Sequence, residues 1–258
     1  PGDASPDPNP VLAGIVAAEM YVKNWMHGSG EIVTIPPRQT VPLSLRRVSP
    51  NETMSGLCSL RLVEGPESLL VRTDAYPPFP VSGKWSDALR STTPWRETGS
   101  NPVNDYDLAA YTISNHVYPD PQKAEQTWTY RVGGRHQFVR IGEKAISRQD
   151  NSGVLDGNFG VFYRIKADVE NPTDKVASVD LHFIPSAGYS GAIFIMDGNL
   201  MRTPLLQPQT PWRITQLKLA PGERQSIRLM TIPLSGSSYP ATLKIGATDQ
   251  VTEISMID

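Results

Sequence analysis

The chain has 258 residues, of which 39% are hydrophobic and 19% charged, and both fractions lie below those of an average globular protein. Its 24 prolines and 20 glycines favour turns and short strands over long helices. The formal net charge of -2 shows no basic surplus of the kind that attracts nucleic acid, so we expect no nucleic-acid partner.

Residues 1–9 are polar and rich in proline, which predicts a flexible N-terminal tail. The first residue is proline, and the stretch reads as the mature end of a chain from which a leader was removed. We therefore expect the protein to be extracellular or part of the cell envelope.

A single amphipathic helix is expected over residues 10–26. Asn9 can cap its first amides, Pro10 is tolerated in the first turn, and Gly28 is a natural stop. Apolar residues follow a period near 3.6, so the helix either packs against a sheet or docks to a neighbouring subunit. Its apolar stretch is only about a dozen residues long and contains Glu19, so no membrane span is expected.

From residue 31 the chain reads as short β runs separated by turn residues. The runs are EIVTIPP, TVPLSLRRV, MSGLCSLRLVEG and SLLVRTDAY. Strands at such short spacing are typical of a sandwich or barrel. Cys58 is the only cysteine, which excludes an intrachain disulfide, and its place in the alternation predicts a small buried side chain.

Residues 75–127 interrupt this pattern with a long stretch rich in Pro, Gly, Ser and aromatic residues. Its aromatic side chains either bind sugar rings or a partner, or they cover the cores. His116 with nearby aspartates has the residue types of a metal or acid–base cluster but no defining spacing, and local turns explain the same residues. The binding candidates are Trp85, Trp95, Tyr106, Tyr111 and Tyr118, and the aspartates are Asp105, Asp107 and Asp120.

From Gln126 onward the period of two is clear, and SVDLHFI places His182 on the polar face of its strand. Gly133–Gly134 between two β runs predicts a hairpin. Residues 171–174 (NPTD) and 220–223 (APGE) are turn quartets between later strands.

The segment 150–158 (DNSGVLDGN) offers many oxygen ligands. Calcium binds six to eight oxygens, which makes Asp150, Asp156 and Asn158 metal candidates, although a plain turn explains the same residues. No other cofactor is expected.

These patterns predict an all-β protein of two β-sandwich domains with one short N-terminal helix. The first domain, residues 10–125, includes the helix, and the second covers residues 126–258. NFG followed by VFYRIKADVENPTD, and later LKLAPGERQSIRLMTIP, resembles bacterial extracellular immunoglobulin-like modules. The stretch IVTIPPRQTVPLSLRRVSPNETMSGLCSLRL is similar to the front half of uncharacterised exported bacterial proteins. This resemblance implies that the sandwiches are immunoglobulin-like and that the protein has a surface or extracellular residence, and it brings no catalytic residues.

The sequence contains no H-E-x-x-H, G-x-S-x-G or Walker motif, so we do not expect an enzyme. The favoured function is a secreted or cell-surface structural or interaction protein, such as an envelope, surface-layer or filament subunit. It would associate with itself or with other envelope proteins through its sandwich surfaces and N-terminal segment. The alternative is a carbohydrate-binding or carbohydrate-active module that uses the aromatic-rich stretch, with its aspartates as carboxylates if it catalyses.

Overall fold

The computed structural model describes residues 2–3, 6–58, 60, 62–65, 125–147 and 154–248. The chain divides into two compact units, and each is treated by itself. The larger unit comprises Pro1–Ser29, Arg46–Ser59 and His116–Asp258, and the smaller comprises Gly30–Leu45 and Leu60–Asn115.

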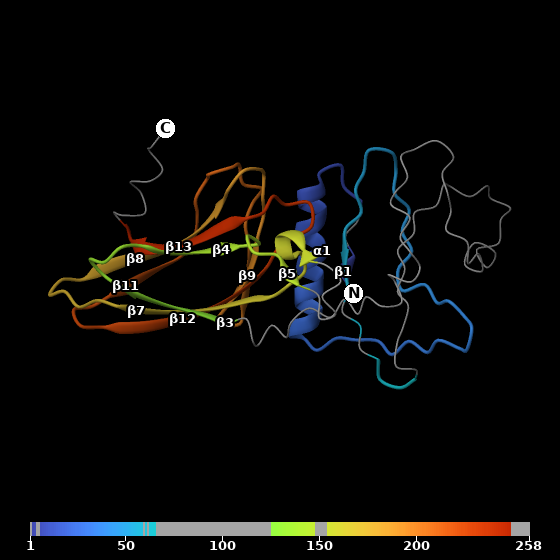
Figure 1. The fold of residues 1–258 in the computed structure, drawn as a ribbon, viewed down its shortest axis with the longest axis horizontal. Coiled ribbons are helices and arrows are strands. Elements are labelled where there is room, and N and C mark those ends of the chain that lie inside the picture. The colour runs from blue at the N-terminus through green and yellow to red at the C-terminus, as the bar shows by residue number, and fades with distance from the viewer. Residues whose placement is uncertain are drawn as a thin grey trace. The chain divides into compact units, whose positions relative to one another are not determined.

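The larger unit contains a sandwich of two β-sheets (Figure 1). Within the described residues, every strand pairing of these two sheets is antiparallel except that of β3 with β7, which is parallel. The prediction of an all-β sandwich with an N-terminal helix is therefore confirmed. The five-stranded sheet has the order β10 (Asn199–Arg202), β9 (Ile193–Met196), β12 (Arg224–Ile232), β7 (Tyr163–Glu170) and β3 (Glu125–Arg131), and the four-stranded sheet the order β11 (Trp212–Leu219), β8 (Ala177–Pro185), β13 (Ala241–Ala247) and β4 (Gln137–Ile141).

In chain order these strands alternate between the two sheets, apart from the β9–β10 hairpin within one sheet. Immunoglobulin domains differ, because several of their consecutive strands share a sheet. The predicted hairpin at Gly133–Gly134 is wrong: the chain turns there, but β3 pairs with β7 and β4 pairs with β13. A glycine pair permits a reversal of the chain, whereas the strand partner is decided by the packing of distant segments.

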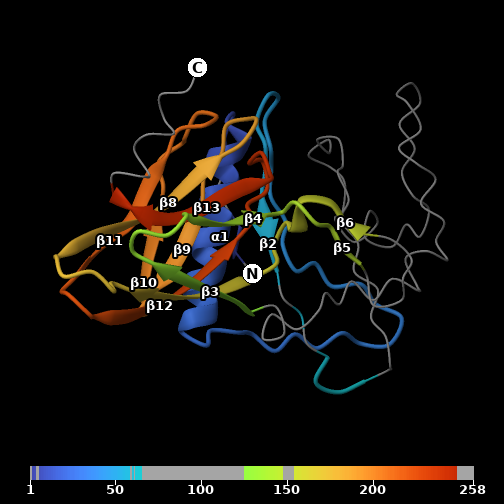
Figure 2. The ribbon, with the colours of Figure 1, turned by 60° about the vertical axis from the view of Figure 1, so that its left-hand side comes forward.

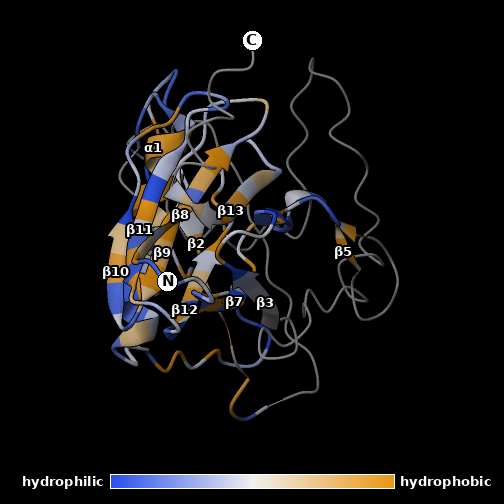
Figure 3. Ribbon diagram, turned by 90° about the vertical axis from the view of Figure 1, so that its left-hand side faces the viewer, coloured by the Kyte–Doolittle hydropathy of each residue, from blue (hydrophilic) through white to orange (hydrophobic). Residues whose placement is uncertain are grey.

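The core lies between the sheets, where inward residues alternate with outward ones along strands such as β7. Figure 3 shows hydrophobic and hydrophilic residues interleaved along β11. Aromatic side chains join the sheets, since the Phe183 and Phe194 rings meet edge to face at 5.6 Å and the Phe194 and Trp212 rings stack at 6.1 Å.

Helix α1 (Pro10–Met26) has the bounds predicted for it, and the Asn9 side chain accepts hydrogen bonds from the amides of Val11 and Leu12. Its buried side packs with Ile193 and Ile195 of β9. Figure 2 shows the helix α1 beside β9. Because Phe194 between them faces the core, β9 is buried on both faces. Helix α1 therefore covers part of the outer face of the five-stranded sheet.

Close packing holds α1 in place. A Cβ atom at Gly14 would lie 1.8 Å from the Ser235 carbonyl oxygen, so only glycine fits there. The Phe162 ring packs against Trp25, with ring centroids 5.2 Å apart. Helix α1 belongs to the same compact unit as the sandwich, whereas the sequence had grouped it with residues up to 125.

The described part of the N-terminal stretch, predicted as a flexible tail, pairs within the chain. Strand β1 (Gly2–Asp3) is antiparallel to β2 (Gly56–Leu57). Further along, the Asp7 amide donates to the Thr53 carbonyl oxygen at 3.2 Å. In return, the Thr53 amide donates to the Asp7 carbonyl oxygen at 2.8 Å. These pairings bring residues 53–57 to the start of the chain.

Within the described residues 30–58, β2 is the only strand, so the strands predicted at 31–36 and 40–48 are wrong. Prolines 36, 37 and 42 remove backbone donors from these runs. Apolar side chains there remain accessible, Ile32 being 89% exposed. Cys58 is exposed rather than buried, because it lies outside any strand that faces a core. Of the first predicted sandwich, residues 66–124 lie outside the described part of the chain.

The two turn quartets of the second half form as predicted, and one buried asparagine ties them together. Asn171 is 0% exposed, and its Nδ2 donates to the carbonyl oxygens of Lys175 at 2.7 Å, Leu219 at 3.1 Å and Ala220 at 3.0 Å. Its Oδ1 accepts from the Thr173 amide and hydroxyl. We call this arrangement the Asn171 turn pair.

Among the described residues, no helix has both the length and the apolar character needed to cross a membrane.

Candidate functional site

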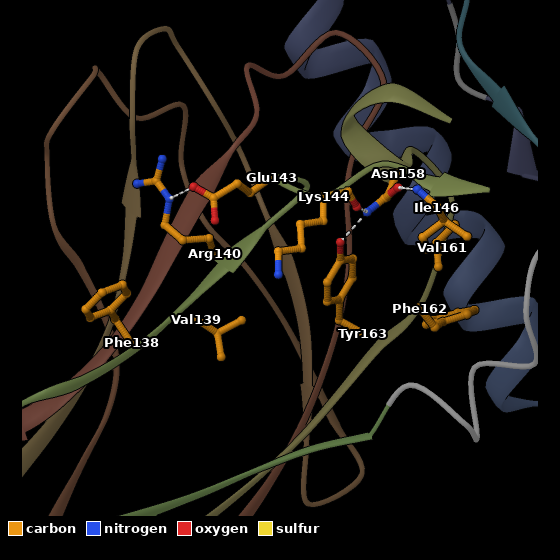
Figure 4. Close-up of a pocket in the computed structure, with 10 residues that line it drawn as sticks. All are labelled: Phe138, Val139, Arg140, Glu143, Lys144, Ile146, Asn158, Val161, Phe162 and Tyr163. Atoms are coloured by element: carbon orange, nitrogen blue, oxygen red, sulfur yellow. Dashed lines mark hydrogen bonds and ion pairs between the residues drawn. The ribbon is translucent and has the colours of Figure 1, made fainter. Parts of the chain in front are cut away.

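A cavity of about 450 Å³ lies beside β4 and the start of β7 (Figure 4). One wall is apolar, and the other carries polar groups from the loop after β4 and from the turn η2 (Asp156–Asn158). The short strand β5 (Ile146–Ser147), which pairs with β6 (Val154–Leu155), contributes Ile146 to the lining. The lining residues are Phe138, Val139, Arg140, Glu143, Lys144, Ile146, Asn158, Val161, Phe162 and Tyr163.

Asn158 fixes the polar wall of this cavity. Its Nδ2 donates to the Lys144 carbonyl oxygen at 2.8 Å and to the Tyr163 hydroxyl at 2.6 Å, while its Oδ1 accepts from the Ile146 amide at 2.9 Å. The Tyr163 hydroxyl also accepts from the Gly142 amide at 3.0 Å. Both polar groups of the Asn158 side chain are thus engaged in holding the loop.

The calcium prediction rested on Asp150, Asp156 and Asn158. Asp156 is exposed in η2, Asn158 is engaged as described, and Asp150 lies outside the described residues. In the part of the chain that the structure describes, no three His, Cys, Asp or Glu side chains gather closely enough to hold a metal ion. Calcium binding by this loop stays a prediction.

Arg140 stands where the cavity meets the outer face of the four-stranded sheet. Its Nε lies 3.3 Å from Glu143 Oε1, and one terminal nitrogen donates to the hydroxyls of Ser186 at 3.2 Å and Thr242 at 3.0 Å. Figure 4 shows the pair with Glu143. Three partners hold this guanidinium in one position.

The outer face of the same sheet carries a line of large polar and aromatic side chains. Lys244 of β13 is directly opposite Phe138 of β4 on one side and His182 of β8 on the other. His182 is in turn opposite Arg213 of β11. Residues opposite each other on paired strands share a face, so these four form a row across all four strands, which we call the cationic row.

Lys244 is the most unusual member of the row. It is only 4% exposed, although it lies on an outer face. Its neighbours across the strands, Phe138 and His182, stand on either side of its alkyl stem. Within the described residues its ammonium has no hydrogen bond or ion pair, and burial lowers the pKa of Lys244 below its usual value.

Two histidines lie near Lys244. Burial lowers the pKa of His182, the Arg213 and Lys244 charges lower it further, and Asp180 opposes them. Burial and the Lys244 charge likewise lower the pKa of His136. The His182 Nδ1 atom is buried without a hydrogen-bond partner. The unprotonated form of both histidines is therefore favoured in the folded protein.

Asp180 is the acidic group beside the row, and it is already engaged. It is 3% exposed, its Oδ1 accepts from Gln216 Nε2 at 2.9 Å, and Arg213 lies 3.9 Å away. Asp180 therefore compensates one end of the row, and among the described residues no carboxylate pairs with the Lys244 ammonium. The arrangement can bind a negatively charged group near Lys244.

The cationic row contains His182, which the sequence had placed on a polar face. Its other three members were not predicted from the sequence. Phe138, Lys244 and Arg213 lie far apart in the chain and meet only through strand register. The signal available beforehand was the outward alternation along each strand. The other predicted site residues, Trp85, Trp95, Tyr106, Tyr111, Tyr118, His116, Asp105, Asp107 and Asp120, lie outside the described residues.

No family model matches the chain, and no curated protein matches it. Among solved structures it is similar to the pre-peptidase C-terminal domain of a collagenase from Bacillus anthracis, with 8% identity over 48% of this chain and 96% of that chain, at a TM-score of 0.25. It is also similar to a ruminal GH26 endo-beta-1,4-mannanase, with 8% identity over 43% of this chain and 25% of that one, at a TM-score of 0.22. It is similar as well to the GH26-CBM35 beta-(1,4)-mannanase of Podospora anserina, with 7% identity over 44% of this chain and 28% of that one, at a TM-score of 0.21.

At such low TM-scores these likenesses carry no argument about function, and the chain spans about a quarter of the length of the two mannanases.

Proposed function

We propose that this protein is an extracellular interaction module, not an enzyme, and that it binds a negatively charged partner on the outer face of its four-stranded sheet. The observation that carries this proposal is Lys244, a lysine with 4% exposure and no polar partner within the described residues. A ligand anion would supply the partner that the described residues do not.

Energetic reasoning supports this function. Burial lowers the pKa of Lys244, so its ammonium has lost part of its hydration, and within the described residues no hydrogen bond or ion pair compensates that loss of free energy. Proteins keep such groups where function requires them, and they tolerate the loss of stability there. An apolar side chain between Phe138 and His182 would stabilise the sheet better than Lys244 does.

The proposal keeps the interaction function expected from the sequence but moves it away from the N-terminal segment. Residues 2–3 pair with β2, Asp7 pairs with Thr53, and α1 is packed on β9. These segments already have partners inside the chain, so they are poor candidates for docking to another subunit. The four-stranded sheet carries groups that still need a partner.

The proposal is tested by calorimetric titration with sodium polyglutamate, a flexible polyanion, and with neutral dextran. We expect polyglutamate to bind at low salt, binding to weaken as salt screens the charges, and dextran not to bind. Lys244→Met should weaken polyglutamate binding about tenfold. The matched control is Lys166→Met, since Lys166 on β7 of the other sheet already pairs with Asp168 at 2.9 Å. Failure to bind any anionic polymer, or equal binding by both variants, would overturn the proposal.

A further inference from the structure

We infer that the partner of the cationic row is an acidic polysaccharide, a chain of uronic acid sugars that lies across the strands of the four-stranded sheet. This inference rests on the proposed function and adds the class of ligand. Its basis is that the row joins an exposed aromatic ring to cationic side chains on one face of the sheet.

Phe138 supplies the aromatic part. It is 57% exposed on the edge strand β4, and the His136 ring lies 6.2 Å from it, centroid to centroid. An exposed flat ring is a favourable surface for the apolar face of a sugar ring. An acidic peptide would need the cations of the row but would gain less from this ring.

Lys244 lies one strand away from Phe138, which suits a sugar that carries its carboxylate at the edge of the ring. A sugar packed on Phe138 would present that carboxylate toward β13. The Lys244 stem is buried, but its four rotatable bonds let the ammonium reach a ligand above the sheet. One sugar would then contact the Phe138 ring and the Lys244 ammonium at the same time.

The row is long enough for more than one sugar. Four adjacent strands at a spacing of about 4.8 Å place Arg213 of β11 roughly 14 Å from Phe138 of β4. Lys244 stands on the second strand of the row and Arg213 on the fourth. Cations on alternate strands match an acidic chain that crosses the strands better than one isolated anion.

Protonation of the two histidines should strengthen this binding. A carboxylate held at Lys244 would counter the positive charges of Lys244 and Arg213 that now lower the pKa of His182, whose other charged neighbour is Asp180. It would do the same for His136, whose pKa the Lys244 charge also lowers. Binding should therefore take up protons, and affinity should rise as the pH falls from about 7.5 to about 5.5.

The experiment compares two uronate oligosaccharides, oligogalacturonate and hyaluronan fragments, with polyglutamate of similar charge, using the full chain. The variants are Phe138→Leu, which keeps an apolar side chain but removes the flat ring, Lys244→Met, and the control Lys166→Met. We expect at least one uronate to bind more tightly than polyglutamate. Phe138→Leu should weaken that binding about fivefold and leave polyglutamate unchanged, while Lys244→Met should weaken both about tenfold.

The outcomes separate this inference from the function on which it rests. Suppose that polyglutamate binding depends on Lys244, but neither uronate binds more tightly or Phe138→Leu has no effect. The inference of a polysaccharide ligand would then be wrong, while the proposed anion-binding function would stand. Binding of no anionic polymer would overturn both. Circular dichroism of each variant confirms that the sandwich is folded, so a loss of binding is read as a loss of contact.

Discussion

Two regions of the sandwich bury polar side chains, and they do so in opposite ways. At the Asn171 turn pair, the amide of Asn171 meets three carbonyl oxygens and its oxygen accepts two hydrogen bonds. In the cationic row, Lys244 has no polar partner within the described residues and His182 Nδ1 is buried without one. Asn171 and Lys244 are both withdrawn from solvent, with exposed fractions of 0% and 4%, but only Asn171 has all its polar groups hydrogen-bonded within the described residues.

The difference teaches how to separate structural polar residues from functional ones. A buried polar group with all its hydrogen bonds made rigidifies the fold, and its removal leaves several partners without a bond. A buried group without partners weakens the fold, and its presence calls for an explanation outside the chain. On this criterion Asn171 and Asn158 belong to the scaffold and Lys244 to the binding site.

The largest expected effect is at the turn pair. Asn171→Ala removes the side chain that joins two loops and leaves three carbonyl oxygens short of a donor, so we expect the free energy of unfolding to fall by about 3 kcal/mol. Urea denaturation followed by fluorescence measures it. Asn199→Ala, at an exposed end of β10 with one long bond of 3.4 Å, should change it by less than about 0.5 kcal/mol. Equal effects of the two changes would show that the turn pair is not a structural centre.

A smaller decrease in the free energy of unfolding is expected from substitution of Asn158, which holds the loop beside the cavity. Asn158→Ala should lower the free energy of unfolding by about 2 kcal/mol, because it removes three hydrogen bonds and places alanine at a φ of 53°. Asn158→Gly relieves the backbone strain but not the lost bonds, so it should recover only part of this loss. Complete recovery by glycine would mean that the hydrogen bonds contribute little.

At Lys244 we expect substitution to raise the free energy of unfolding, whereas at Asn171 and Asn158 substitution lowers it. Lys244→Met should raise the free energy of unfolding by about 1 kcal/mol, because it replaces a partly desolvated ammonium by an apolar group of similar length. Lys166→Met on the opposite sheet should change it by less than about 0.5 kcal/mol. A variant that is more stable and binds less is the signature of a functional residue, whereas destabilisation by Lys244→Met would assign Lys244 to the scaffold.

Local sequence signals predicted the scaffold well. The Asn9 cap, Pro10 and the apolar period determined α1, and the period of two identified the strands from Tyr163 onward. The two quartets were recognisable as turns because proline, glycine and asparagine act locally. The runs at 31–36 and 40–48 failed because alternation without a pairing partner does not make a strand, and prolines reduce its hydrogen bonding.

The candidate site could not be read in the same way. Its members come from β4, β8, β11 and β13, and they meet only once the order and register of those strands are established. Alternation placed His182 on a polar face, but nothing local shows that Lys244 lies beside it. The sequence also drew attention to aromatic residues of 75–127, and their role as a binding surface stays a prediction.

The smallest expected effect is a pH dependence that the row has and the turn pair lacks. Burial and the Lys244 charge lower the folded-state pKa of His136 and His182, while an unfolded histidine titrates near about 6.5. Below that pH the unfolded chain binds more protons, so the free energy of unfolding should fall as the pH decreases from 8 to 5.5. Lys244→Met removes one cause of the pKa shift, so the free energy of unfolding should depend less steeply on pH.

The decrease in the free energy of unfolding caused by Asn171→Ala should be the same at both pH values. The side chains of the turn pair that bond to one another, Asn171 and Thr173, do not titrate. A slope of opposite sign, or one unchanged by Lys244→Met, would show that the charges of the row do not act on these histidines.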